Sequence, residues 1–202
     1  MIISFEGIDG CGKSTQIQLL IQYFTARGET CVTLREPGGT EISEKIRSLL
    51  LHETDEMNSV TELLLFSAAR SQLITEKIQP LQQSGTVIIL DRFFDSTTAY
   101  QGYGRESAAI EAIEFLNRLA THHTEPDLTF YLKIDPEKAA ARNTSQNYDR
   151  IEKEGVGFFK KVTEGYDQLA ELHKRIHTVD ASLTPEQIHL LVTGIISDFR
   201  QS

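Results

Sequence analysis

A glycine-rich segment near the start of the chain constrains the fold more than any other feature. Residues 7–14 read Gly-Ile-Asp-Gly-Cys-Gly-Lys-Ser and fit the pattern G-x-x-x-x-G-K-[ST]. The mostly apolar residues 2–6 before it favour a strand, and residues 14–27 after it place apolar side chains at helical spacing. A strand, this loop and a helix, in that order, predict a phosphate-binding loop, or P-loop.

The residue types of this loop suit a nucleoside triphosphate such as ATP. Glycines let the backbone turn so that successive N–H groups face phosphate oxygens, and the positive end of the following helix favours the same anion. Lys13 supplies a charge for the β- and γ-phosphates, and the Ser14 hydroxyl is a ligand for Mg²⁺. The residues expected to bind the triphosphate are Gly7, Ile8, Asp9, Gly10, Cys11, Gly12, Lys13, Ser14 and Thr15.

Length and charge narrow the class of protein. With 202 residues, the chain is expected to form one domain, 1–202, with a substantial core. The formal net charge of −9 argues against a nucleic-acid polymer as a partner. We expect a cytoplasmic protein without a membrane span, because we find two cysteines, no secretion signal and no run of about 18 apolar residues.

Segments typical of strands and of helices alternate along the chain. Several of the strand segments are continuous apolar runs, as in a parallel sheet that is buried on both faces. Strands are expected at 2–6, 31–34, 86–90, 128–134 and 176–179. Helices are expected at 14–27, about 40–51, 58–83, about 107–122, 135–143, 149–174 and 184–200. This alternation predicts an α/β protein with a doubly wound, five-stranded parallel sheet flanked by helices.

Charged residues follow the strands, at the edge where such a sheet binds its ligands. Asp91 follows the apolar run 87–90, a placement typical of a carboxylate near Mg²⁺, and Arg92 comes next. A salt bridge at the strand end is the alternative interpretation of this pair. Arg35 follows the second strand and begins the segment Arg-Glu-Pro-Gly-Gly-Thr.

Two helical segments carry side chains that suit a nucleobase. Phe66 and Arg70 lie four residues apart and so share a helix face, where a ring can stack on a base beside an arginine that bonds to its carbonyl group. An aromatic residue at this spacing is more often part of the core. Residues 91–104 add short polar groups at helical spacing, namely Ser96, Thr97, Tyr100 and Gln101.

A polar segment without periodicity, residues 142–152, lies between two helical segments and is expected to be a mobile lid. Arg142 and Arg150 near its ends could close over phosphates and stabilise the charge of a transferring phosphoryl group. The alternative is an exposed loop whose arginines have no such role.

Taken together, these motifs resemble those of the thymidylate kinases, a family of P-loop nucleoside monophosphate kinases. The matching segments, in the order and spacing of the family, are 5–15, 35–40, 66–70, 91–93, 96–101 and 149–152. The resemblance implies the P-loop NTPase fold, a homodimer, and the reaction ATP + dTMP → ADP + dTDP with Mg²⁺, in dTTP biosynthesis. It also implies direct in-line transfer, because the phosphate of dTMP is itself the nucleophile.

The resemblance assigns roles to individual residues. Lys13 and Ser14 would hold the ATP phosphates and Mg²⁺, near Asp91, and Asp9 would bind the 3′-hydroxyl of the deoxyribose. Arg92 would bridge the two phosphate groups, and Arg35 would hold the phosphate of dTMP. The residues implied around thymine are Phe66 stacked on it, Arg70 at its O4, Ser96, Thr97 and Gln101 lining it, and Tyr100 against C2′.

The chain departs from the family at the catalytic arginine. Members place this arginine in the P-loop or in the lid, and Gly10 occupies the P-loop position here, so the chain resembles the lid-arginine type common in bacteria. Yet residues 143–147 contain no arginine. Our hypothesis is that Arg150, with or without Arg142, supplies the lid charge; Arg142 could instead pack against adenine.

Three rival functions stay open at the level of sequence. The nearest is a related P-loop kinase that acts on another nucleoside monophosphate or on a deoxynucleoside. A P-loop switch protein is a second, although the chain has no guanine-specific Asn-Lys-x-Asp segment. A kinase-like protein without activity is the third, suggested only by the arginine-poor lid.

Overall fold

The sheet is built as the sequence predicts. A computed structural model describes residues 1–51, 56–142 and 149–201 of the chain. Within these ranges, five parallel strands form one sheet in the order β2-β3-β1-β4-β5. The strands are β1 Ile2–Glu6, β2 Cys31–Arg35, β3 Val87–Asp91, β4 Leu128–Lys133 and β5 Ile176–Asp180. The predicted strand ends agree with these to within one residue, a difference that is usual where hydrogen bonding stops.

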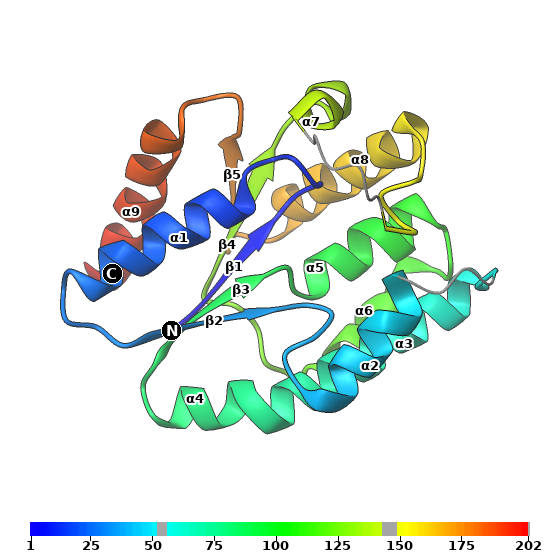
Figure 1. Ribbon diagram of the computed structural model, residues 1–202, viewed down its shortest axis with the longest axis horizontal. Helices are drawn as coiled ribbons and strands as arrows, with labels where there is room; N and C mark the ends of the chain where they lie inside the picture. Colours follow the sequence, from blue (N-terminus) through cyan, green and yellow to red (C-terminus); the bar gives the residue numbers. More distant parts are fainter. Residues whose placement is uncertain (52–55, 143–148, 202) are drawn as a thin grey trace.

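Helices cover both faces of the sheet. In Figure 1, α1 and α9 lie together on one side, while α2, α3, α5 and α6 lie on the other. The helices are α1 Lys13–Thr25, α2 Glu41–Leu51, α3 Ser59–Leu73, α4 Gln79–Gln83, α5 Phe94–Thr97, α6 Ile110–Ala120, α7 Pro136–Arg142, α8 Val156–Leu172 and α9 Pro185–Gln201. Two π-helical turns, η1 Ile74–Ile78 and η2 Thr98–Gly104, continue α3 and α5. Within the described ranges, no helix is both long and apolar enough to cross a membrane.

Successive side chains of a strand point to opposite faces of the sheet, and apolar residues on both faces explain why helices cover both. Ile3 and Phe5 of β1 pack into one apolar cluster with Leu20 of α1, whereas Ile2 packs into a second cluster with Ile78. All five residues of β1 are buried, as the continuous apolar runs of the sequence predict for a central parallel strand.

One predicted helix begins later than expected. The segment 149–174 was predicted to be helical throughout, but α8 starts at Val156. The Asp149 carboxylate accepts hydrogen bonds from the backbone N–H groups of Ile151 and Glu152, at 2.8 Å each. This side chain competes with helical hydrogen bonding and forms a turn instead, and Gly155 then caps the helix.

Candidate active site

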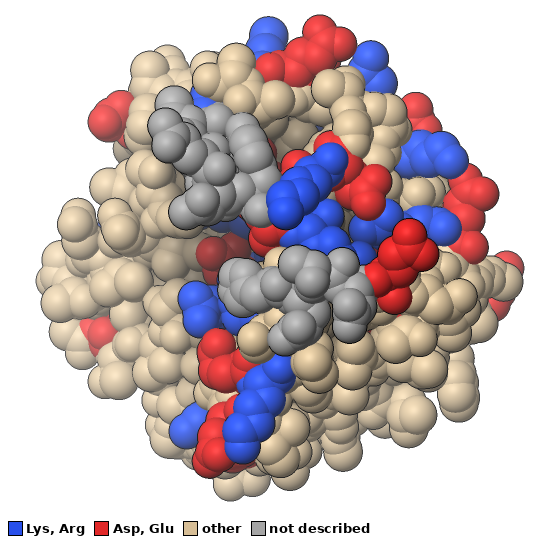
Figure 2. All heavy atoms as spheres, turned by 45° about the vertical axis from the view of Figure 1, so that its right-hand side comes forward, with Lys and Arg blue, Asp and Glu red and all other residues tan. Residues whose placement is uncertain are grey.

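A cavity of about 620 Å³ opens where β1, β2 and β3 end. Although the chain is acidic, the described residues that line the cavity include six basic side chains and five carboxylates, and Figure 2 shows both kinds gathered at the hollow. The basic residues are Lys13, Arg35, Arg47, Arg70, Arg92 and Arg142, and the acidic ones are Asp9, Glu36, Asp91, Asp149 and Glu152. This local excess of cations suits phosphate groups.

The P-loop forms one wall of the cavity. Its glycines have backbone angles that other residues rarely adopt, and at Gly10 there is also no room for a side chain. Gly7, Gly10 and Gly12 all have positive φ angles. A Cβ atom at Gly10 would lie 2.5 Å from the carbonyl oxygen of Ala139 in α7. This position therefore excludes an arginine side chain, unless α7 moves, which explains physically why the P-loop of this chain carries none.

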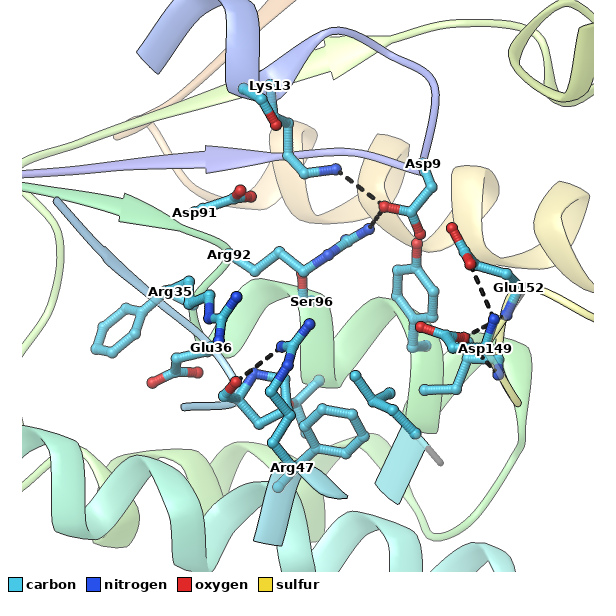
Figure 3. Close-up of a pocket in the computed structure, with 18 of the residues that line it drawn as sticks. Asp9, Lys13, Arg35, Glu36, Arg47, Asp91, Arg92, Ser96, Asp149 and Glu152 are labelled. Carbon is cyan, nitrogen blue, oxygen red and sulfur yellow. Dashed lines mark hydrogen bonds and ion pairs between the residues drawn. The ribbon is translucent and has the colours of Figure 1, made fainter. Parts of the chain in front are cut away.

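Lys13 and Arg92 converge on one carboxylate, Asp9. Arg92 Nη2 lies 2.8 Å and Lys13 Nζ 3.6 Å from Asp9 Oδ1, and Figure 3 shows the two side chains reaching Asp9. Burial raises the pKa of the Asp9 carboxyl, but Arg92 and Lys13 outweigh it and hold this pKa well below its usual range. Asp9 is thus an ionised acceptor between two cations.

Arg92 adopts a strained backbone conformation to reach this place. Its φ angle is +68°, in the left-handed region, which costs a residue with a side chain about 1–2 kcal/mol. Hydrogen bonds fix the turn: the Arg92 N–H donates to Phe5, and the Phe93 N–H donates to the Glu6 carboxylate at 2.7 Å. Such strain is typical of a functional position.

Glu6 lies behind the strained turn and was missed by the sequence analysis. Its carboxylate accepts hydrogen bonds from the hydroxyls of Ser96 and Tyr166. Burial, followed by the charge of Asp95, raises the pKa of Glu6 to about 7, against the lowering effects of the Ser96 hydrogen bond and of Arg92. The available signal was an acidic residue at the end of a buried apolar strand.

Arg35 and Arg47 lie on the β2 side of the cavity. Arg35 Nη2 lies 3.2 Å from Glu44 Oε2, and Arg47 Nη1 donates to the carbonyl oxygen of Pro37 at 2.8 Å. Burial and the neighbouring charge of Arg35 lower the pKa of Arg47. Figure 3 shows the side chains of Arg35 and Arg47 reaching into the cavity near Arg92, whose own guanidinium turns to Asp9, so an anion beside Arg35 and Arg47 would meet two cations. Arg47 was not predicted, because it reads as an ordinary residue of an amphipathic helix.

The residues predicted to surround a base come together on the α3 and η2 side. Phe66 is half-buried and lines the cavity, as do Thr97, Tyr100 and Gln101. Arg70 is 1% exposed and also lines the cavity. The partners of its guanidinium are Glu36 at 2.8 Å, Thr97 at 2.9 Å and Asn117 at 3.1 Å. The Phe66 ring, which can stack on a base, and the fixed hydrogen-bond donors of Arg70 thus lie on the same wall of the cavity.

Ser14 and Asp91 fit the expected place of Mg²⁺. Both line the cavity, at the start of α1 and at the end of β3. The next residue, Arg92, forms its ion pair with Asp9 of the P-loop. In the part of the chain that the structure describes, no group of three or more His, Cys, Asp or Glu residues could hold a metal ion alone. A hydroxyl and one carboxylate match the few protein ligands that Mg²⁺ takes beside phosphates and water.

The two arginines of the predicted lid lie in different places. Arg142 lines the cavity and donates to the carbonyl oxygen of Ala181 at 2.8 Å. Arg150 is not among the residues that line the cavity; it donates to Leu50 at 2.9 Å and pairs with Glu62. The geometry therefore does not bring Arg150 to the phosphates. The middle of the predicted lid, 143–148, lies outside the described residues.

A P-loop that faces an aromatic ring and fixed hydrogen-bond donors across a group of arginines, on this sheet, is the arrangement of a nucleoside monophosphate kinase fold. Comparison with known proteins narrows the class. A sequence profile of the family "Thymidylate kinase" matches residues 5–192. The thymidylate kinase of Chlorobaculum parvum is 46% identical over 200 residues, which cover 94% of this chain and 92% of that protein. The chain therefore belongs to the thymidylate kinase family.

Further relatives agree over almost the whole length. The thymidylate kinase of Thermoanaerobacter pseudethanolicus is 42% identical over 198 residues, covering 98% of this chain and 97% of that protein. The crystal structure of thymidylate kinase from Ehrlichia chaffeensis is similar with a TM-score of 0.80 and 32% identity, and 98% of each chain is covered. The predicted family and fold are thus confirmed.

Proposed function

We propose that this protein transfers the γ-phosphoryl group of Mg-ATP to dTMP, forming ADP and dTDP for dTTP synthesis in the cytoplasm. One observation carries the proposal: a single cavity joins the P-loop at one end to Phe66, Arg70 and Gln101 at the other. Arg92 lies between these ends, paired with Asp9 of the P-loop. Membership of the thymidylate kinase family supports the choice of base.

ATP occupies the P-loop end in this proposal. Backbone N–H groups of 7–15 and the start of α1 hold the triphosphate, and Lys13 leaves its loop carbonyl partner, Gly7 at 3.0 Å, for phosphate oxygens. Ser14 and Asp91 would hold Mg²⁺, which neutralises phosphate charge when bound. Arg142 packs against adenine in this proposal, which is supported by its contact with Ala181 after the fifth strand.

The acceptor dTMP occupies the other end. Its phosphate is held by Arg35 and by Arg47, both of which line the cavity beside Pro37. Asp9 binds the 3′-hydroxyl, and the Tyr100 ring crowds C2′ so that a ribonucleotide fits less well. Phe66 stacks on thymine, while Arg70, Ser96, Thr97 and Gln101 line its edge.

The chemistry needs no nucleophile from the protein. A phosphate oxygen of dTMP attacks the γ-phosphorus while the bond to the ADP oxygen breaks. Lys13, Arg92 and the arginines at the acceptor phosphate position the two anions and balance the charge that spreads over the transferred group. For Arg150 to act as the catalytic arginine of a lid at about 142–152, its ion pair with Glu62 would have to open first.

The proposal includes a homodimer. Helices α2, α3 and α6 lie side by side in Figure 1, and each carries an exposed apolar pair at helical spacing. These residues are between 43% and 62% exposed: Ile42 and Leu49, Val60 and Leu64, Phe115 and Leu119. A second copy of the chain would cover such a surface.

A panel of acceptors tests the proposed function. Release of ADP from Mg-ATP is followed with dTMP, dUMP, dCMP, dGMP and thymidine under the same conditions. We expect the highest kcat/KM with dTMP. A higher value with dCMP or with thymidine would assign the protein to a related kinase instead.

A further inference from the structure

The carboxylate of Glu62 in α3 is buried, and the proposed chemistry gives it no role. Its side chain is 1% exposed, yet it meets donors from three separate segments. Oε1 accepts from Gln101 Nε2 at 2.8 Å and from Arg105 Nε at 3.3 Å, and Oε2 accepts from Arg150 Nη2. Two guanidinium groups therefore balance its charge, as a buried carboxylate requires.

This contact fixes which end of the Gln101 amide faces Glu62. The amide has a donor end, Nε2, and an acceptor end, Oε1, and the two are sterically alike. A carboxylate between two arginines offers only acceptors, so Nε2 must turn toward it. Because Gln101 also lines the cavity, its carbonyl oxygen is the end that is left for a ligand.

Arg70 presents the opposite polarity on the same wall. Its guanidinium carries only donors and is held by Glu36 and Thr97. Among the described residues, Nη1 donates to Asn117 alone, which leaves its second hydrogen for a carbonyl group. The wall thus offers an acceptor at Gln101 and a donor at Arg70.

We propose that Glu62 is a positioning residue that fixes the polarity of Gln101 and thereby selects an imide base over cytosine. Thymine and uracil pair an N3–H donor with carbonyl acceptors, which complements this wall. Cytosine presents an acceptor at N3 and an amino donor at C4, and so opposes it at both points. The inference rests on the proposed function, in which the base lies against Phe66.

The test compares Glu62→Gln with Glu154→Gln. An amide at position 62 can donate as well as accept, so Gln101 becomes free to turn over. Glu154 is the matched control, because it pairs with Arg105 in the same cluster without touching Gln101 in the described structure. We expect Glu62→Gln to lower the ratio of kcat/KM for dTMP over dCMP about tenfold or more, and Glu154→Gln to leave it within about twofold.

A double-mutant cycle separates this role from loss of folding. The same ratio is measured for Gln101→Leu and for Glu62→Gln combined with Gln101→Leu, together with the affinity for each nucleotide by calorimetry. If Glu62 acts through Gln101, the double variant discriminates no less than Gln101→Leu alone. An additive loss, or an unchanged ratio in Glu62→Gln, overturns the inference. Failure of the wild-type protein to phosphorylate dTMP would instead overturn the proposed function.

Discussion

At the scale of single residues, four of the six basic side chains described around the cavity already form ion pairs within the protein. Lys13 and Arg92 share Asp9, Arg35 pairs with Glu44, and Arg70 pairs with Glu36. These contacts hold each side chain in place at little cost when phosphates arrive, because one anion replaces or joins another. Preorganisation of this kind is the main source of catalysis expected for phosphoryl transfer.

Replacement of Lys13 tests this view at the donor end. We expect Lys13→Ala to lower kcat/KM for dTMP by roughly 10²–10³-fold, because the charge on the transferring group loses one fixed cation. Lys45→Ala is the control, since Lys45 is exposed and pairs only with Glu41 in the described structure. Steady-state rates of both variants decide the matter; equal rates for Lys13→Ala and wild type would remove Lys13 from the mechanism.

The raised pKa of Glu6 predicts that the free energy of unfolding depends on pH. Its pKa rises from 4.5 to about 7 on folding, so between these values the folded state binds more protons than the unfolded state. The free energy of unfolding therefore decreases as pH rises from about 4.5 to about 7, and the effect is complete above that range. Glu6→Gln removes this contribution while it keeps an acceptor for the Phe93 N–H.

The measurement is urea unfolding of both proteins from pH 4.5 to 8. The stability of the wild type relative to Glu6→Gln should fall across the lower part of this range and then level off. A difference that stays constant, or that rises with pH, would show that the Glu6 pKa is not raised by folding.

At the scale of elements, close packing of α8 on η2 holds the helix that carries Tyr100 and Gln101. A Cβ atom at Gly165 of α8 would lie 2.7 Å from the ring of Tyr103 in η2. Gly194 of α9, by contrast, is exposed, and no atom of the described residues outside its own stretch of helix lies within 4 Å of such a position. The two glycines therefore respond oppositely to the same substitution.

Replacing each of these two glycines by alanine tests the packing of α8 on η2. We expect Gly165→Ala to lower the free energy of unfolding by about 1–3 kcal/mol through overpacking. Gly194→Ala should raise it by about 0.5–1 kcal/mol, because alanine favours a helix. Thermal or urea unfolding measures both; a stabilised Gly165→Ala protein would contradict the tight contact.

Elements and site differed in how far the sequence could predict them. Apolar periodicity is a local property, so it located all five strands and the long helices of the described chain. The contacts of Glu6 and Glu62 are not local: Glu6 reaches Tyr166, 160 positions away, and Glu62 reaches Arg150, 88 positions away. Spacing within one segment carries no information on such pairs, which is why Glu6, Glu62 and Arg47 were missed and why the ion pair of Arg150 with Glu62 was not expected for a residue assigned to the lid.

At the scale of the whole molecule, the proposed dimer has a direct test. A charge at the exposed apolar surface of α6 would be buried without a partner, so Leu119→Glu should weaken association roughly 100-fold. Leu190→Glu on α9 is the control, since Leu190 is 70% exposed and outside this surface. Sedimentation velocity distinguishes monomer from dimer; an intact Leu119→Glu dimer would place the interface elsewhere.

One cavity is proposed to bring two nucleotides together for direct transfer. Its most direct test uses ATP labelled with ³²P at the γ-position, with Mg²⁺ and dTMP, and follows the label by chromatography. Direct transfer yields one labelled dTDP for each ADP formed and leaves no label on the protein. Label that appears as inorganic phosphate, or on a protein side chain, would contradict it.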